Sequence, residues 1–150
     1  NVAMGNHDIP CPWDYYETIG GGMGASRNRA GLSAVQSHMT NTLNTPIESL
    51  ESHYPLRVRE YSIRRRSGGK GHRQGGDGLV REFEFLGETE VTLLTERRLR
   101  GPWGLEGGES GLPGKQTLDG EILAGKVSFR ASPGQILRVE TPGGGGFGSK

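Results

Sequence analysis

The side chains most able to do chemistry are concentrated in one short segment of the sequence. Residues 38–46 read HMTNTLNTP, with one His, two Asn and three Thr before a proline. Asn and Thr side chains compete with the backbone for hydrogen bonds, so this composition favours a loop over a regular element. Thr40, Asn41 and Asn44 are predicted to make neutral hydrogen bonds, either within the loop or to a carbonyl-bearing substrate.

His38 and Glu17 are the two candidates for proton transfer. His38 can change its charge near neutral pH or ligate a metal, although a single His is also a common hydrogen-bonded structural residue. Glu17 stands among Trp13, Tyr15 and Tyr16, and burial among these rings would raise the pKa of its carboxyl group and suit it to act as a general base. The alternative for Glu17 is an outward position on an alternating strand. We predict Glu17 and His38 as catalytic residues and keep both structural alternatives open.

Three glycine-rich stretches, residues 20–31, 67–78 and 143–150, carry further candidates. The first is predicted to be a long mobile loop, and it lacks the lysine of a phosphate-binding loop. The second is predicted to be flexible without a partner surface. Its Arg73 would bind a substrate or a phosphate from a neighbouring subunit, or the stretch is only a linker. The third has Ser before Lys, the reverse of a nucleotide-binding loop, and is predicted to be a strained glycine turn.

The overall composition excludes several classes of protein. The net charge is +1, so the chain lacks the strong positive field of a nucleic-acid-binding domain, and we expect no nucleic acid partner. The local basic cluster at residues 64–73 indicates a solvated loop or a subunit contact, with phosphate or RNA binding as the alternative. A single cysteine, Cys11, excludes an internal disulfide and a structural zinc site. No apolar run reaches the length of a membrane span, so we expect no membrane contact and a cytoplasmic location.

The hydrophobic periodicity predicts a mainly β fold that positions these candidates. Glycine at 27 positions weighs against long helices, and residues 1–12, with Pro10 and Pro12, are predicted to be loop. One short helix should follow Pro46, with Thr45 as its N-cap. Residues 79–85 and 89–95 are expected to pair as a hairpin. In all we expect about six short, mostly antiparallel strands joined by long glycine-rich loops, at residues 13–19, 58–63, 79–85, 89–95, 127–129 and 136–139.

Several blocks of the sequence, in a fixed order, resemble one known family. They are YYETIGGG at residues 15–22, SAVQSHMTNT at 33–42, NTPIE at 44–48, ERR at 96–98, PWG at 102–104 and TPGGGGFG at 141–148. Together they resemble the B-type subunits of ATP-dependent hydantoinases and 5-oxoprolinases, a family that also includes subunits of acetone and acetophenone carboxylases. Family members are several times longer. The resemblance implies that residues 1–150 are the C-terminal portion of such a domain, incomplete at its N-terminal side and α+β in the full subunit.

The resemblance also implies a function, cofactors and a partner. It implies an N-methylhydantoinase or 5-oxoprolinase that opens hydantoin or 5-oxoproline rings with ATP hydrolysis. ATP and Mg²⁺ are then bound mainly by a partner A-type subunit, and the metal site of the carboxylase relatives maps upstream of this sequence. We therefore expect no metal site within these residues, a hetero-oligomer, and no activity for the chain alone. Two alternatives remain: a subunit of an ATP-dependent acetone or acetophenone carboxylase, and a non-catalytic module that docks against the A-type partner.

Overall fold

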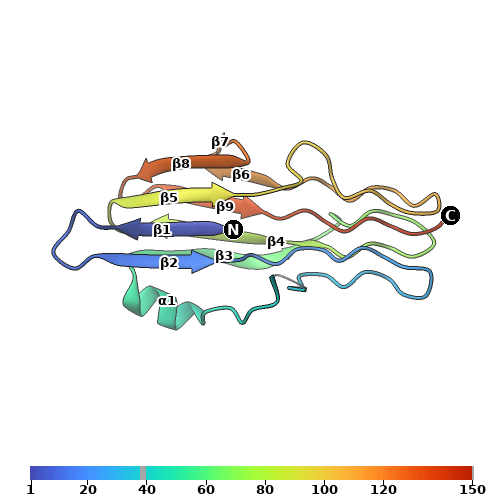
Figure 1. The fold of residues 1–150 in the computed structure, drawn as a ribbon, viewed down its shortest axis with the longest axis horizontal. Helices are drawn as coiled ribbons and strands as arrows, with labels where there is room; N and C mark the ends of the chain where they lie inside the picture. The colour runs from blue at the N-terminus through green and yellow to red at the C-terminus, as the bar shows by residue number, and fades with distance from the viewer. Residues whose placement is uncertain (38–39, 150) are drawn as a thin grey trace.

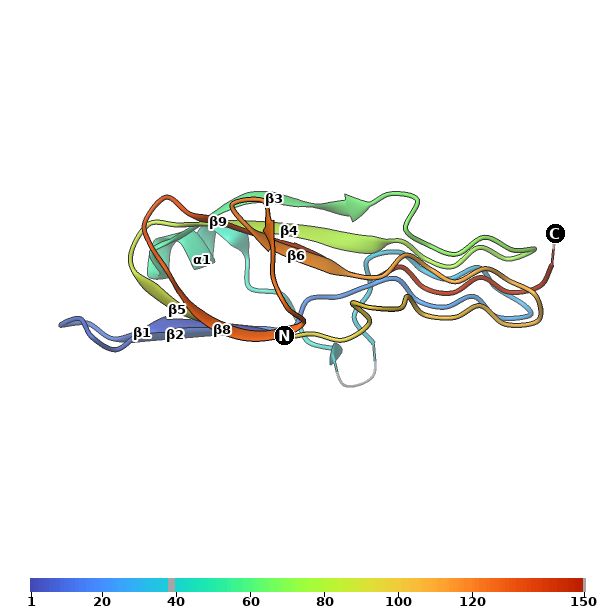
Figure 2. The same ribbon diagram turned by 90° about the horizontal axis from the view of Figure 1, so that it is seen from above.

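A computed structural model describes residues 1–37 and 40–149, which form two antiparallel sheets. One sheet has the strand order β2-β1-β5-β8 and the other has the order β3-β4-β9-β6-β7. The bounds are β1 Val2–Asn6, β2 Trp13–Glu17, β3 Leu56–Arg64, β4 Gly78–Phe85, β5 Thr89–Leu94, β6 Lys115–Leu118, β7 Glu121–Ile122, β8 Lys126–Ala131 and β9 Ile136–Glu140. The two layers are seen edge-on in Figure 2. The predicted mainly β fold class is confirmed, with more strands than expected.

The hydrophobic core lies between the two sheets. Phe83 and Phe85 of β4 point inward and are fully buried, because side chains alternate between the two faces of a strand. They belong to one cluster with Val91 and Leu93 of β5, and each fully buried side chain of this size contributes about 1.5–3 kcal/mol. The helix α1 Ile47–His53 closes the edge of the sandwich beside β2 and β3 (Figure 1) and adds the fully buried Leu50 to the core.

The pairing of the strands corrects two predictions. Residues 79–85 and 89–95 do not form a hairpin, because β4 pairs with β3 and β9 whereas β5 pairs with β1 and β8. The short connection after β4 instead carries the chain from one sheet to the other. Residues 1–12 are not all loop either: β1 pairs along its length with β2 and β5, and its Val2 and Met4 are buried in the core. The prolines that suggested a loop lie only in the turn after β1.

The start of the helix also differs from the prediction. Pro46 is the N-cap residue, and no side chain caps the helix, so Thr45 does not have the predicted capping role. Thr45 instead lines a pocket together with Tyr15 of β2. This pocket, between the segment before α1 and β2, is where the candidate site lies.

The glycine-rich stretches form a second ordered part of the molecule. Extended segments from residues 20–35, 67–78, 101–112 and 142–148 run side by side beyond the ends of the strands (Figures 1 and 2). In the last segment the N–H of Gly143 donates to Leu112, that of Gly144 to Gly76, and that of Gly146 to Glu109. Different N–H groups of this segment thus donate to different neighbouring segments. This pattern is typical of a polyproline II-like chain, which has about three residues per turn and no internal hydrogen bonds.

Close packing explains why this array consists of glycine. A Cβ added to Gly144 would lie 2.0 Å from the carbonyl oxygen of Met23, and one added to Gly75 would lie 2.1 Å from that of Gly144. No side chain fits at such contacts. The predictions of a mobile loop at residues 20–31, a flexible loop at 67–78 and a strained turn at 143–148 are therefore wrong, because these stretches satisfy each other's backbone groups.

Candidate active site

A polar pocket of about 210 Å³ lies where β2 ends. Residues 15–18 form one wall, and residues 42–45, in the segment before α1, form the other. Its lining includes the carboxyl group of Glu17, several hydroxyl groups and the amide of Asn44. The structure thus brings two of the predicted site residues, Glu17 and Asn44, to one pocket.

Glu17 is the buried acid of this pocket. Only 6% of the residue is exposed, so the alternative of an outward-facing glutamate is wrong. Its carboxylate lies 3.4 Å from the guanidinium of Arg81 and accepts a hydrogen bond of 3.1 Å from the Tyr15 hydroxyl. Burial raises the pKa of Glu17, and the charge of Arg81 and the Tyr15 hydrogen bond offset only part of that rise. The carboxyl group can therefore hold a proton at a higher pH than an exposed glutamate can.

Tyr15 is a neutral hydrogen-bond donor in this arrangement. Burial and the negative charge of Glu17 raise the pKa of Tyr15 to about 12. The phenol thus stays protonated at neutral pH and directs its O–H at the carboxylate. The ring of Tyr54 packs against Tyr15 with a centroid distance of 5.2 Å, which limits the movement of this donor.

Arg81 supports Glu17 from the opposite sheet. It is fully buried on the inward face of β4, with its guanidinium 4.2 Å from the ring centroid of Tyr61 and 5.1 Å from that of Phe83. Its Nε and Nη1 have no hydrogen-bond partner among the described residues. Sequence reasoning did not select Arg81 as a site residue, although a charged residue on the apolar face of a strand was a signal that could have identified it.

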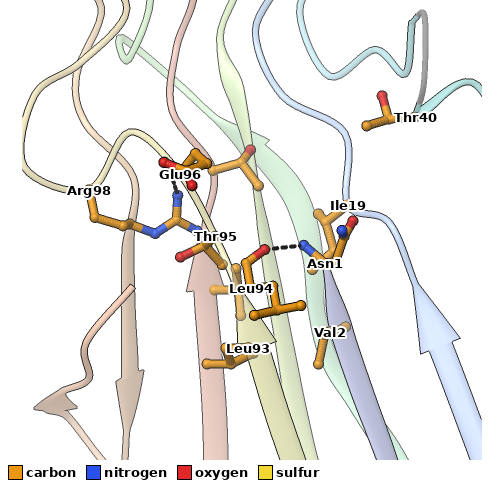
Figure 3. Close-up of a pocket in the computed structure, with 11 residues that line it drawn as sticks. Asn1, Val2, Ile19, Thr40, Leu93, Leu94, Thr95, Glu96 and Arg98 are labelled. Atoms are coloured by element: carbon orange, nitrogen blue, oxygen red, sulfur yellow. Dashed lines mark hydrogen bonds between the residues drawn. The ribbon is translucent and has the colours of Figure 1, made fainter. Parts of the chain in front are cut away.

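Thr40 lines two neighbouring cavities, and Asn41 is exposed beside it. The larger cavity has a volume of about 300 Å³ and reaches the four-stranded sheet at Val2 and Leu93. Figure 3 shows Thr40 beyond Ile19, across this cavity from Leu93. Thr40 is therefore not part of the lining of the Glu17 pocket.

The remaining predicted residues are not part of this arrangement. Arg73 is exposed and pairs through its backbone with Phe147, near the C-terminal end of the glycine array. His38 lies outside the described residues.

The described residues contain no cluster of metal ligands, and the last glycine-rich stretch does not fit the phosphates of a nucleotide. Residues 1–37 and 40–149 contain no group of three or more His, Cys, Asp or Glu side chains that could hold a metal ion. The N–H groups of Gly143, Gly144, Gly146 and Gly148 donate to backbone carbonyls of neighbouring segments, so they are not free to bind phosphate oxygens.

No helix of the described part is long and apolar enough to cross a membrane.

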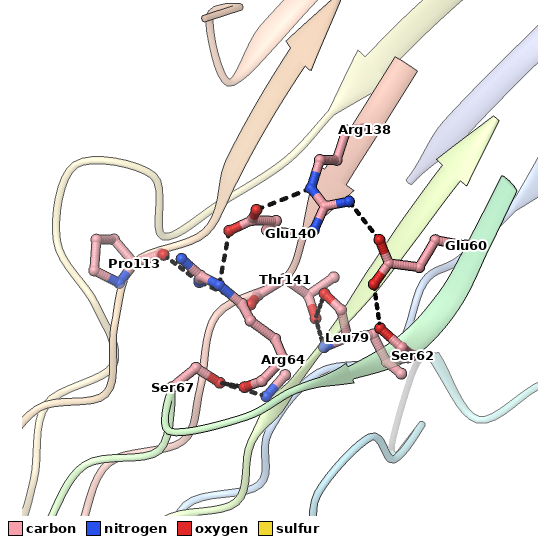
Figure 4. A network of polar contacts seen from close by, with 10 residues as sticks. Glu60, Ser62, Arg64, Ser67, Leu79, Pro113, Arg138, Glu140 and Thr141 are labelled. Atoms are coloured by element: carbon pink, nitrogen blue, oxygen red, sulfur yellow. Dashed lines mark hydrogen bonds and ion pairs between the residues drawn. The ribbon is translucent and has the colours of Figure 1, made fainter. Parts of the chain in front are cut away.

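A separate ionic network covers the outer face of the five-stranded sheet (Figure 4). Arg138 donates to Glu60, to Glu82 at 2.8 Å and to Glu140 at 3.1 Å, and Arg64 pairs with Glu140 at 2.9 Å. These side chains are partly exposed, and ion pairs of this kind contribute about 0–1 kcal/mol each. We assign the network to the junction where β9 continues into the glycine array, away from the Glu17 pocket.

Comparison with known proteins identifies relatives over the whole chain. The sequence model of the hydantoinase B/oxoprolinase family matches residues 1–150. The chain is 49% identical to 5-oxoprolinase 1 of Arabidopsis thaliana over 140 residues, which are 90% of this chain and 11% of that protein. It is 34% identical to the B-type subunit of a putative D-/L-hydantoinase from a Pseudomonas species, over 99% of this chain and 26% of that protein.

Two solved structures share the fold. An ATP-dependent caprolactamase from Pseudomonas jessenii superposes with a TM-score of 0.79 at 24% identity, over 99% of this chain and 28% of that one. Nucleotide-free acetone carboxylase superposes with a TM-score of 0.72 at 17% identity, over 98% of this chain and 25% of that one. The chain thus spans about a tenth to a quarter of the length of these relatives, and it belongs to the hydantoinase B/oxoprolinase family.

Proposed function

We propose that the chain is part of the B-type subunit of an ATP-dependent cyclic-amide hydrolase of the 5-oxoprolinase or N-methylhydantoinase type. Membership of the family and the names of the relatives support the reaction class. The observation that carries the proposal is the Glu17 pocket, where a buried carboxyl group of raised pKa faces hydroxyl and amide side chains. A ring-opening hydrolase needs such a group to accept a proton from water.

The residues of this chain have distinct roles in the proposed reaction. Glu17 acts as general base on the water that attacks the ring carbonyl, and Arg81 holds the carboxylate in place. His38 is the second proton carrier. Asn44, with Thr40 and Asn41 along the same loop, donates and accepts hydrogen bonds at the substrate amide.

ATP, Mg²⁺ and the A-type partner subunit complete the proposal. ATP supplies the phosphoryl group that makes the amide reactive, and Mg²⁺ neutralises its phosphates. We assign both to the A-type subunit, because the described residues here contain no metal cluster and the N–H groups of the last glycine-rich stretch, at Gly143, Gly144, Gly146 and Gly148, already donate to backbone carbonyls. Arg73 would act at the contact with that partner, and the assembly would work in the cytoplasm.

The test uses the complete A/B assembly with 5-oxoproline and hydantoin as substrates. Glu17→Gln should lower ATP-dependent ring opening by about 10²–10⁴-fold, the range typical of general acid–base catalysis. Glu82→Gln is the matched control, since it removes a partly buried carboxylate paired with Arg138 on the opposite face of β4. Turnover by Glu17→Gln equal to that of Glu82→Gln would contradict the proposal.

Two other functions give different results in the same assembly. Because the chain shares its fold with acetone carboxylase, a carboxylase subunit is the second candidate function. A carboxylase would hydrolyse ATP in dependence on bicarbonate and a ketone, and would not open the rings. A non-catalytic assembly module would keep full turnover in Glu17→Gln and in Asn44→Ala while the subunits bind each other more weakly.

A further inference from the structure

Gln36 is placed between the two walls of the Glu17 pocket, although sequence reasoning gave it no role. Its Nε2 donates to the backbone oxygen of Thr18 at 2.8 Å and to Oδ1 of Asn44 at 2.7 Å. Its Oε1 accepts from the N–H of Thr42 at 3.2 Å and from the Thr42 hydroxyl at 3.0 Å. A carboxamide has two N–H groups and two oxygen lone pairs, so these four bonds use its full capacity.

The backbone around Gln36 is fixed on the side of the glycine array. Val35 pairs with Gly21 through two backbone hydrogen bonds of 2.9 and 3.1 Å. A Cβ added to Gly20 would lie 3.1 Å from Cγ of Gln36, so the glycine leaves space for the stem of this side chain. Gln36 therefore reaches from an anchored backbone to the segment at residues 42–44.

The contacts continue from Gln36 to the buried acid. Asn44 donates through Nδ2 to the hydroxyl of Tyr61. The ring of Tyr61 covers the guanidinium of Arg81, and Arg81 pairs with Glu17. Gln36 is thus connected, through Asn44 and Tyr61, to the ion pair of Arg81 and Glu17.

We propose that Gln36 is a positioning residue that sets the width of the Glu17 pocket by holding residues 42–44 against the end of β2. The effect of Gln36 on catalysis rests on the proposed function. Its effect on the width of the pocket rests on the geometry alone. Without Gln36, the bond between the hydroxyls of Thr18 and Thr42, at 3.2 Å, is the remaining side-chain link between the two walls at this point among the described residues. The substrate amide would then meet Asn44 at a displaced position.

A cysteine pair measures the width directly. Thr18→Cys and Thr42→Cys replace two hydroxyls that lie 3.2 Å apart, which is close enough for a disulfide. The exposed Cys11 is first changed to Ser to leave one pair. In the complete assembly, with oxidised glutathione as oxidant, the pair should cross-link about tenfold or more slowly in Gln36→Leu than with Gln36 present, because several hydrogen bonds are lost. Equal rates would overturn the inference.

Gln135 provides a matched control for the loss of a hydrogen-bonded glutamine. Its side chain donates to Asp119 and accepts from the N–H of Ser132 in the turn between β8 and β9, at the opposite end of the strands from Glu17. Gln135→Leu should leave the cross-linking rate unchanged. If Gln36→Leu does not fold, Gln36→Glu keeps the size and the acceptor oxygen but loses both donors, and it should also slow the reaction.

Kinetics separate a positioning role from a structural one. Gln36→Leu should raise KM for the cyclic amide more than it lowers kcat, and the disulfide between the two introduced cysteines should restore KM until a reductant opens it. If the disulfide forms but KM is not restored, the positioning role is overturned. If the wild-type assembly opens no cyclic amide, the proposed function fails, and the cross-linking rates still decide whether Gln36 sets the width.

Discussion

Substituting glycine in the array tests whether its close backbone contacts define its structure. Gly22 is the most informative position, because a Cβ there would lie 2.0 Å from the oxygen of Gly76 and 2.6 Å from the nitrogen of Gly144. Those two atoms form a backbone hydrogen bond of 2.9 Å. Gly22→Ala must therefore separate two neighbouring segments and break that bond.

The magnitude follows from the two costs of this substitution. Overpacking a tightly packed site costs about 1–3 kcal/mol, and leaving a buried donor or acceptor without a partner costs about 1–3 kcal/mol. We expect a local loss of about 3 kcal/mol, which corresponds to amide hydrogen exchange about 100-fold faster in the array. The control is Gly24→Ala in the same segment, where the nearest atom would be 3.9 Å away. It should change local stability by no more than about 0.5 kcal/mol.

The assay is hydrogen–deuterium exchange on the intact protein, read at the amides of Gly76 and Gly144. Both amides donate within the array, to Met23 and to Gly76, so their exchange reports its opening. Exchange in Gly22→Ala within about threefold of the wild type would refute the reasoning, because the array would then tolerate a side chain at its closest contact.

Three further predictions concern charged and polar side chains. Glu17→Ala should lower the free energy of unfolding, measured with urea, by about 3–5 kcal/mol, because it leaves the fully buried Arg81 unpaired. The double variant Glu17→Leu/Arg81→Met should lose less of this free energy, because it leaves no unpaired charge. His7 lies 3.0 Å from Asp14, and that hydrogen bond raises the pKa of His7 above its ordinary value of 6.5. The stabilising effect of this pair is therefore complete below pH 6.5 and is lost as the pH rises through the raised pKa of His7. In an NMR titration, Asp14→Asn should return the pKa of His7 towards 6.5. Tyr61→Phe removes the acceptor for Asn44 and should cost about 0.5–1.5 kcal/mol, whereas no change in unfolding would show that this hydrogen bond is unimportant.

The sequence predicted best where one local pattern determines the structure. Alternation of apolar and charged residues identified β4, and burial among aromatic neighbours was one of the two positions predicted for Glu17. The predicted pairing of β4 with β5 was wrong, because the same sequence pattern is compatible with a hairpin and with a connection between two sheets. Local patterns hold no information on which partner a strand selects.

The ordered glycine array could not be predicted from single stretches. A glycine-rich segment alone is flexible, and Gly144 is ordered because Gly76 and Gly69 supply hydrogen-bond partners from distant parts of the chain. Gln36 was missed for a related reason. Its partners lie on both sides of it in the sequence, at Thr18 and in residues 42–44, and no spacing rule connects them.

The pH dependence of ring opening tests the central claim most directly, namely that Glu17 transfers the proton in this pocket. For the complete A/B assembly, kcat/KM for the cyclic amide should fall on the acidic side with a pKa above that of an ordinary glutamate, because Glu17 is buried. Arg81→Met should move this limb to still higher pH, since it removes the charge that favours the carboxylate. A limb that stays in place in Arg81→Met, or that persists in Glu17→Gln, would contradict the claim.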